Sequence, residues 1–379
     1  MGSNSIGKEF VFTCFGESHG RCIGAVIDGC PAGLPLTVED IQNELDKRLP
    51  QNQEIVSTRR EEDIVEILSG IYEGFTTGAP ICVLVWNKEI NSEDYEAIRH
   101  TPRPGHADYP TRIKYLGFND NRGGGRFSGR LTAAFIMAGA IAKKLLKLAG
   151  IDIVAYSTEI DCVKMMASLS FKEIKEKTYQ SSVRCPDLKA SKLMEAAILK
   201  AKNDGDSVGG IVECLVFNVL AGVGEPIFDS LDAELAKMIF SIPAIKGVEF
   251  GVGFEAARMK GSQNNDSYAM QDGEVRALSN NAGGVLGGLS SGMPIVIRMA
   301  IKPTPSIVKE QKTVDMLEMK DTTIQVKGRH DACIVPKAVP VIESSVALIL
   351  VDQLICAGLI PKVLGVEGVG EYSDIAEEN

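Results

Sequence analysis

Three of the four histidines in this sequence lie where an imidazole could transfer a proton. His19 lies in a Gly-Glu-Ser-His-Gly segment, His106 lies between Arg-Pro-Gly and Ala-Asp, and His330 lies in Gly-Arg-His-Asp. Because imidazole titrates near neutral pH, these residues are candidates for general acid–base catalysis. A structural or exposed position is the alternative for each, and for His330 it is equally well supported. No two histidines have the i, i+4 spacing of a helical metal site, so we expect no metal.

A basic segment interrupts an otherwise acidic chain. Residues 103–130 hold six Arg and Lys residues against two Asp, a local charge of +4 in a protein whose formal net charge is −10. Arg122, Arg126 and Arg130 are spaced by four, and three glycines separate the first two. Arginine binds carboxylate or phosphate through paired hydrogen bonds, glycines let backbone N–H groups approach an anion, and a following helix N-terminus adds positive charge. The segment predicts an anion site, with a solvated basic turn as the alternative.

Two further segments suit a bound ligand. Residues 302–306 supply a cation, hydroxyls and a backbone stiffened by proline, directly after an expected strand. Residues 282–288 are too rich in glycine for a core element. Ordinary loops are the alternative for both. The glycine-rich segments match neither a P-loop nor a dinucleotide fingerprint, and Ser18 lacks the following helix of a hydrolase nucleophile elbow.

Length and composition indicate a globular protein with a sizeable core. The 379 residues are 45% hydrophobic and 24% charged. The negative net charge disfavours nucleic acid and anionic membrane surfaces as partners. The sequence has no run of 18 apolar residues and no apolar signal region, so we expect no membrane span and a cytoplasmic location. Nine cysteines without a CxxC pair favour free thiols over a zinc or redox motif.

Hydrophobic periodicity predicts helices and strands that are mixed without regular βαβ alternation, which favours an α+β fold. We expect strands over residues 10–15, 22–27, 64–72, 81–86, 151–156, 211–219 and 293–301. We expect helices over residues 38–47, from 128 or 132 to 148, and over 187–202, 231–240 and 338–359. Thr37 and Asp229 are expected caps, and residues 158–185 show no clear pattern. No linker is evident, so residues 1–366 are expected to form one domain, followed by an acidic tail over 367–379.

Ten segments in a particular order carry a family resemblance: residues 15–20, 28–31, 59–63, 68–70, 103–108, 122–126, 205–209, 261–264, 302–306 and 328–331. In this order the sequence closely resembles chorismate synthases. The resemblance implies a lyase that removes phosphate and one ring hydrogen from 5-enolpyruvylshikimate 3-phosphate, which gives chorismate in the last step of the shikimate pathway towards aromatic amino acids. It implies reduced FMN as the cofactor, without net redox change. It also implies a homotetramer whose fold is a helical layer sandwiched between antiparallel β-sheets.

The resemblance assigns roles to individual residues. It implies that His19 is the acid beside the leaving phosphate, that His106 keeps reduced flavin suitably protonated, and that Asp331 assists transfer of the ring proton near the flavin. The residues that correspond to flavin contacts are Arg126, Phe127, Ser128, Pro243, Ala244, Gly287, Lys302, Pro303, Thr304, Pro305, Ser306 and Arg329. Those that correspond to substrate or nucleotide contacts are Arg48, Arg103 and Arg130. The family is also associated with NADP, but no flavin-reductase domain is evident, so we expect a monofunctional enzyme.

The sequence departs from the common family pattern at several positions near the flavin contacts. They are Phe127, Gly129, Leu131, Pro243 and Ala332, and Glu54 stands where arginine is common. The candidate acid–base residues are kept, so we expect activity. Two other function classes stay open. One is another flavin- or phosphate-binding oxidoreductase, and the other is a noncatalytic phospholigand-binding protein, which would explain the arginines but not His19, His106 or Asp331.

Overall fold

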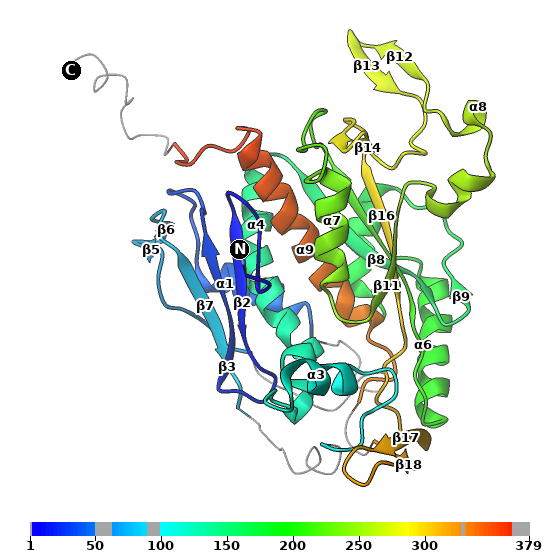
Figure 1. Ribbon diagram of the computed structural model, residues 1–379. Coiled ribbons are helices and arrows are strands. Elements are labelled where there is room, and N and C mark those ends of the chain that lie inside the picture. The colour runs from blue at the N-terminus through cyan, green and yellow to red at the C-terminus, as the bar shows by residue number, and fades with distance from the viewer. Residues whose placement is uncertain (1, 50–62, 89–98, 327–329, 366–379) are drawn as a thin grey trace.

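The computed structural model describes residues 2–49, 63–88, 99–326 and 330–365. Two five-stranded sheets and two long helices account for most of the core (Figure 1). This mixed helix-and-sheet architecture confirms the coarse prediction from the sequence. The expected division into residues 1–366 and an acidic tail stays a prediction, because residues 367–379 lie outside the described part of the chain.

The first sheet has the strand order β1–β2–β3–β7–β4, and all neighbours are antiparallel. Its strands are β1 Ser5–Ile6, β2 Val11–Gly16, β3 Cys22–Asp28, β4 Val65–Ile67 and β7 Ile81–Trp86. The single strand predicted over 64–72 is wrong, because the chain turns at Gly70, whose φ is +84°. Ile71–Tyr72 (β5) therefore pairs with Phe75–Thr76 (β6) and not with the sheet.

The second sheet has the order β11–β16–β10–β8–β9, again antiparallel. Its strands are β8 Asp152–Ile160, β9 Val163–Lys164, β10 Gly210–Phe217, β11 Ile245–Phe250 and β16 Ile295–Ile301. Three hairpins complete the strands: β12 Tyr268–Gln271 with β13 Glu274–Ala277, β14 Val285–Leu286 with β15 Leu289–Ser290, and β17 Gln311–Asp315 with β18 Lys320–Ile324.

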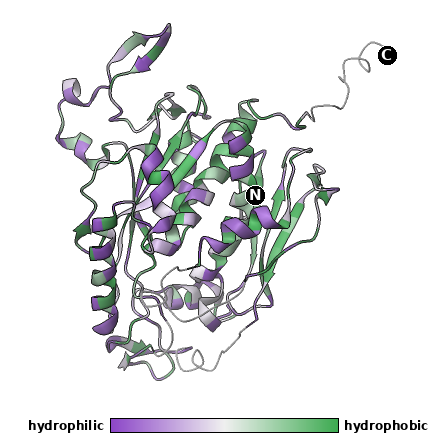
Figure 2. Ribbon diagram, turned by 180° about the vertical axis from the view of Figure 1, so that it is seen from behind, coloured by the Kyte–Doolittle hydropathy of each residue, from purple (hydrophilic) through white to green (hydrophobic). Residues whose placement is uncertain are grey.

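The helices α4 (Thr132–Leu148) and α9 (Val335–Cys356) pack against each other. On its other side α4 contacts strands of the first sheet, while α9 contacts β8 and β10 of the second. As the apolar composition of residues 131–142 predicts, α4 is buried on most faces. The helix α9 begins three residues before the predicted start, with proline in its first turn, where the missing N–H costs little. Figure 2 shows the hydrophobic residues gathered in the sheets and between them.

Shorter helices surround this core. They are α1 Val38–Asp46, α3 Asp108–Tyr115, α5 Phe171–Lys177, α6 Leu188–Asn203, α7 Leu231–Phe240 and α8 Gly261–Asn264, with 3-10 segments η1 Arg122–Phe127, η2 Gly129–Leu131, η3 Thr178–Gln180 and η4 Gly253–Arg258. Thr37 caps α1 as predicted, through a reciprocal pair with Asp40. The predicted cap Asp229 is wrong, because it instead pairs with Lys8 at 2.6 Å and Ser230 precedes α7.

The helix α9 is also long and apolar enough, by length and composition alone, to cross a membrane. However, 94% of its most apolar window is buried inside the protein, which is typical of a core helix. All nine cysteines lie in the described residues and have free thiols, of which Cys162 is exposed. Burial raises the pKa of the Cys30 and Cys333 thiols to about 12.

The α4–α9 contact predicts a stability effect at Gly139. A Cβ atom at this position would lie 2.2 Å from Ser344 Cβ and 2.6 Å from Ser344 Cα, so the helices would have to separate. We expect Gly139→Ala to lower the free energy of unfolding by about 1–3 kcal/mol, although alanine is the better helix former. Urea unfolding measures this change.

Gly261→Ala is the matched control, since nothing lies within 4 Å of a Cβ there and its φ is not positive. Equal stability of the two variants would contradict the close approach of the helices.

Candidate active site

His19 is held at the end of the first sheet by the turn that joins β2 to β3. Gly16 ends β2 with a φ of +95°, a conformation that favours glycine. The backbone N–H of Ser18 donates to the carbonyl of Gly125 at 3.2 Å, which ties this turn to the glycine-rich segment. Ser18 and His19 are both buried. The imidazole therefore lies in a packed environment beside residues 123–125.

A loop of three consecutive glycines, residues 123–125, separates the two imidazoles. Their φ angles are +60°, +87° and +52°, so side chains are disfavoured at all three positions. A Cβ at Gly123 would lie 2.4 Å from Cδ2 and 2.6 Å from Nε2 of His19. A Cβ at Gly124 would lie 3.1 Å from Cε1 and 3.2 Å from Nε2 of His106. Two histidines that are 87 positions apart in the sequence thus contact adjacent glycines.

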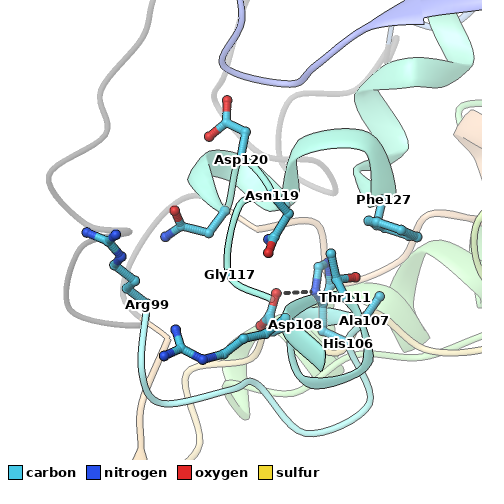
Figure 3. A pocket seen from close by; sticks show the side chains of 12 residues that line it. Arg99, His106, Ala107, Asp108, Thr111, Gly117, Asn119, Asp120 and Phe127 are labelled. Atoms are coloured by element: carbon cyan, nitrogen blue, oxygen red, sulfur yellow. Dashed lines mark hydrogen bonds and ion pairs between the residues drawn. The ribbon is translucent and has the colours of Figure 1, made fainter. Parts of the chain in front are cut away.

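His106 is oriented by a carboxylate. Its Nδ1 lies 2.6 Å from Oδ1 of Asp108 (Figure 3). Arg103 donates to both oxygens of the same carboxylate, from Nε at 2.7 Å and from Nη2 at 2.8 Å. Burial opposes ionisation of Asp108, but the hydrogen bonds from Arg103 and His106 outweigh it and hold the pKa of Asp108 well below its usual range.

The loop 302–306 packs beside this cluster. Nη1 of Arg103 donates to Oγ of Ser306 at 3.1 Å, and Nζ of Lys302 donates to the carbonyl of Gly105 at 2.8 Å. The backbone N–H of Lys302 donates to the carbonyl of Ala244 at 3.0 Å. Burial and the nearby Lys246 lower the pKa of Lys302. Three predicted ligand segments, which contain Arg103, Ala244 and Lys302, therefore meet at one end of the molecule.

Asp331 is connected to the 302–306 loop through neighbouring residues. Its Oδ2 forms an ion pair with Nζ of Lys337 at 2.6 Å. The carbonyl of the next residue, Ala332, accepts from Val208 N–H at 2.8 Å, and the neighbouring Ser207 hydroxyl donates to the Thr304 carbonyl at 2.7 Å. Asp331 is thereby connected to the 302–306 loop through residues 207–208.

The arginines spaced by four point to different partners. The exposed Arg122 pairs with Asp120 at 2.8 Å. Arg126 donates to the carbonyls of Cys14 and Gly16 and to Oδ1 of Asn4. The buried Arg130 pairs with Asp63 at 2.5 Å. The left-handed glycines interrupt the helical geometry that would place positions four apart on one face, so the structure does not bring the three guanidinium groups together.

Arg48 and Arg130, both predicted to contact substrate or nucleotide, share one carboxylate. Nη1 of Arg48 lies 3.8 Å from the Asp63 oxygen that pairs with Arg130, and Nη2 of Arg48 donates to the carbonyl of Gly129 at 3.1 Å. Arg130 also donates to Oδ1 of Asn87 at 3.1 Å. The two cations thus form a cluster around Asp63, a residue that sequence reasoning did not assign to the site.

Two hollows lie in this part of the structure, and only the smaller one is lined by the glycine loop, through Gly124. A small one of about 30 Å³ is lined by His106, Asp108, Gly124 and Phe127 (Figure 3). A larger cavity of about 600 Å³ is lined by Arg126 and Pro243 together with the N-terminal segment and α7. Ser128 directly precedes η2, and its hydroxyl accepts a hydrogen bond from the Arg130 N–H at 3.3 Å. Ligand pockets usually enclose about 300–1,000 Å³, so the larger cavity has the size of a cofactor site.

Two predicted flavin contacts are not part of this arrangement. Gly287 lies in the turn between β14 and β15, at the opposite end of the molecule from α3 (Figure 1). Arg329 lies outside the described residues, as does Glu54. Sequence reasoning also missed the role of Asp108, although an acid two positions after His106 was a usable signal. Among the described residues, no group of three or more His, Cys, Asp or Glu could hold a metal ion.

The fold and these contacts define a mixed helix-and-sheet protein with paired histidines beside a cationic loop. Comparison with known proteins gives the family. The family model for chorismate synthase matches residues 10–355. The chain is 53% identical to a chorismate synthase of Dehalococcoides mccartyi over 96% of this chain and 99% of that one, and 51% identical to that of Korarchaeum cryptofilum over 93% and 98%.

A solved structure gives the same result. A crystal structure of chorismate synthase superposes with a TM-score of 0.73 at 31% identity and covers 93% of each chain. The chain belongs to the chorismate synthase family and is a lyase.

The contact between Gly123 and His19 predicts the result of a substitution. Gly123→Ala combines an unfavourable φ with a Cβ that collides with the imidazole, so His19 must move. Because a displacement of about 1 Å at a reacting group can lower rates about 10²-fold, we expect a fall of about that size in kcat/KM, measured as chorismate formation.

Gly74→Ala is the matched control, with a φ of +81° and nothing within 4 Å of the added Cβ. It carries similar backbone strain away from the histidines and is expected to keep its turnover. An equal loss in both variants would indicate general destabilisation and contradict the role of this contact.

Proposed function

We propose that this protein catalyses the reduced-FMN-dependent 1,4-elimination of phosphate from 5-enolpyruvylshikimate 3-phosphate to give chorismate. The single observation that supports this most strongly is the glycine loop, which contacts His19 through Gly123 and His106 through Gly124. An elimination that expels phosphate and removes a ring hydrogen needs proton transfer at two points of one substrate. The two imidazoles that contact this loop provide His19 as the acid for the leaving phosphate and His106 as the group that keeps reduced flavin protonated, and Asp331 is assigned the ring proton.

The residues present fit a flavin mononucleotide. The glycine loop leaves space that any Cβ would fill, and Gly124 lines the small hollow beside His106. A separate cavity of about 600 Å³, with Arg126 and Pro243 in its wall, has the size of a cofactor site. We propose that Arg126, Phe127, Ser128, Pro243, Ala244, the 302–306 loop and Arg329 contribute to holding the cofactor. When bound, reduced FMN would supply electron density transiently to the substrate, with no net redox change.

The chain's own residues would bind anions and move protons. The substrate carries two carboxylates and a phosphate, which suit the cations Arg48, Arg103, Arg130 and Lys302. His19 would protonate the leaving phosphate, on which negative charge grows as its C–O bond breaks. His106, whose Nε2 lies beside the glycine loop, would keep reduced flavin suitably protonated, and Asp331 would assist removal of the ring proton.

Several finer properties belong to the same proposal. The contacts of α4 with the first sheet and of α9 with the second support a helical layer sandwiched between antiparallel sheets. We also propose a monofunctional, cytoplasmic homotetramer that acts on a small molecule and binds neither nucleic acid nor membrane. The net charge of −10 supports this choice of partners.

An anaerobic assay tests the function. Purified protein, 5-enolpyruvylshikimate 3-phosphate and dithionite-reduced FMN are expected to yield chorismate and phosphate in equal amounts, with catalytic rather than stoichiometric flavin. A parallel reaction with oxidised FMN and NADPH, without another reductant, is expected to yield none. Reductant consumed in proportion to product would instead favour a flavin oxidoreductase, and chorismate in the NADPH reaction would contradict the monofunctional assignment.

Variants of the two histidines separate an enzyme from a ligand-binding protein. We expect His19→Ala and His106→Ala each to lower turnover by roughly 10²–10⁴-fold, the range for loss of acid–base assistance. Ligand affinity, measured by calorimetry, should change much less than turnover. Unchanged turnover in both variants would remove the assigned roles, and binding without any turnover in the wild-type protein would favour the noncatalytic alternative.

A further inference from the structure

A carboxylate outside the predicted site residues controls the environment of His106. Asp108 is the first residue of α3, and its Oδ1 lies 2.6 Å from Nδ1 of the imidazole. Its backbone is fixed by the helix, and its side chain is about four-fifths buried. The separation is that of a strong, charge-assisted hydrogen bond.

Arg103 holds this carboxylate in place. It donates to both oxygens of Asp108, and its remaining terminal nitrogen donates to Ser306 at 3.1 Å. The Arg103 side chain is only 4% exposed, so its charge needs this partner. The result is a chain of contacts from the 302–306 loop through Arg103 and Asp108 to His106.

This arrangement selects one tautomer of the imidazole. An ionised carboxylate only accepts hydrogen bonds, so Nδ1 must carry the hydrogen that it donates to Asp108. Nη2 of Arg103 also lies 3.1 Å from Nδ1, but both groups are donors and both are directed at Oδ1 of Asp108. The other nitrogen, Nε2, faces the glycine loop near Gly124, where it can exchange a proton with a ligand.

We propose that Asp108 is a positioning residue for proton transfer by His106: it fixes the tautomer and the ring orientation, and Arg103 anchors it to the 302–306 loop. This inference rests on the proposed function. Asp108 acts through the imidazole and needs no contact with substrate or cofactor.

Other charged groups surround His106 and bear on its pH dependence. Arg103 stands three positions before His106 in the sequence. Lys302, in the 302–306 loop, donates from Nζ to the carbonyl of Gly105, the residue before His106. Arg99, Arg112 and Asp120 line the same hollow. Asp120 is paired with Arg122, so Asp108 is the carboxylate in direct contact with the imidazole.

Asp108→Asn tests the proposal in the complete enzyme with reduced FMN. We expect kcat to fall about 10²-fold, with a smaller change in KM. The limb of the pH–rate profile that belongs to His106, identified as the limb lost in His106→Ala, is expected to move to lower pH. The sign follows because the variant removes the negative charge that favours imidazolium and leaves the positive charge of Arg103 beside the ring.

The double variant His106→Ala/Asp108→Asn distinguishes positioning from general structural support. If Asp108 acts through His106, the double variant should be no slower than His106→Ala alone. The proposal would be overturned if the losses of turnover in the two single variants multiplied in the double variant. It would also be overturned if the His106 limb of the pH–rate profile did not move in a folded Asp108→Asn protein. Either result would leave the proposed function intact. Wild-type turnover in His106→Ala would overturn this proposal and the role assigned to His106, and the elimination reaction itself would stand.

Two further measurements complete the test. Asp152→Asn is the matched control. Asp152 lies in β8 of the second sheet, and the substitution breaks its exposed ion pair with Lys175, so the His106 limb of the pH–rate profile should stay in place. In the wild-type protein, ¹⁵N NMR of labelled histidine, with His106→Ala to assign the signal, should show hydrogen on Nδ1 when the ring is neutral. Hydrogen on Nε2 would overturn the proposal, and this measurement depends on neither turnover nor the folding of a variant.

Discussion

The structure of this site depends on close packing of two imidazoles against backbone that carries no side chain. At Gly123 a single added carbon would lie 2.4 Å from the His19 ring, and at Gly124 it would lie 3.1 Å from the His106 ring. The same glycines have positive φ angles, so conformation and space impose the same requirement. Any residue other than glycine would separate two groups whose proximity is needed for proton transfer on one ligand.

The cations around this loop are balanced locally. Asp108 neutralises Arg103, and Asp63 lies between Arg48 and Arg130, so buried guanidinium groups are paired before a ligand arrives. Such pairing fixes the direction of each guanidinium group and reduces the entropy lost when an anion binds. Lys302 differs from these paired arginines, because its Nζ donates to the carbonyl of Gly105.

Sequence reasoning predicted most elements but not the contacts between them. Hydrophobic patterning located β3, β7, α4 and α7 closely, and the Thr37 cap located the start of α1, because both signals act locally. The four-residue spacing of the arginines did not show where their side chains lie, because the glycines between the first two adopt left-handed conformations. The placement of His19 and His106 against adjacent glycines, and the contact of Arg103 with Ser306 across 203 positions, depend on tertiary packing that no local pattern encodes.

The position of Gly287 limits how the flavin contacts implied by the family can be made. The turn that holds it lies at the end of the molecule opposite α3 (Figure 1). Lys302 and Ser306 instead contact Gly105 and Arg103, which adjoin His106. The contact at Gly287 that the resemblance implies therefore lies away from the contacts around His106. No hydrogen bond of the described residues connects this turn with the 302–306 loop, so a role for Gly287 in holding the cofactor has no support from the contacts that hold Arg103, Lys302 and Ser306 together.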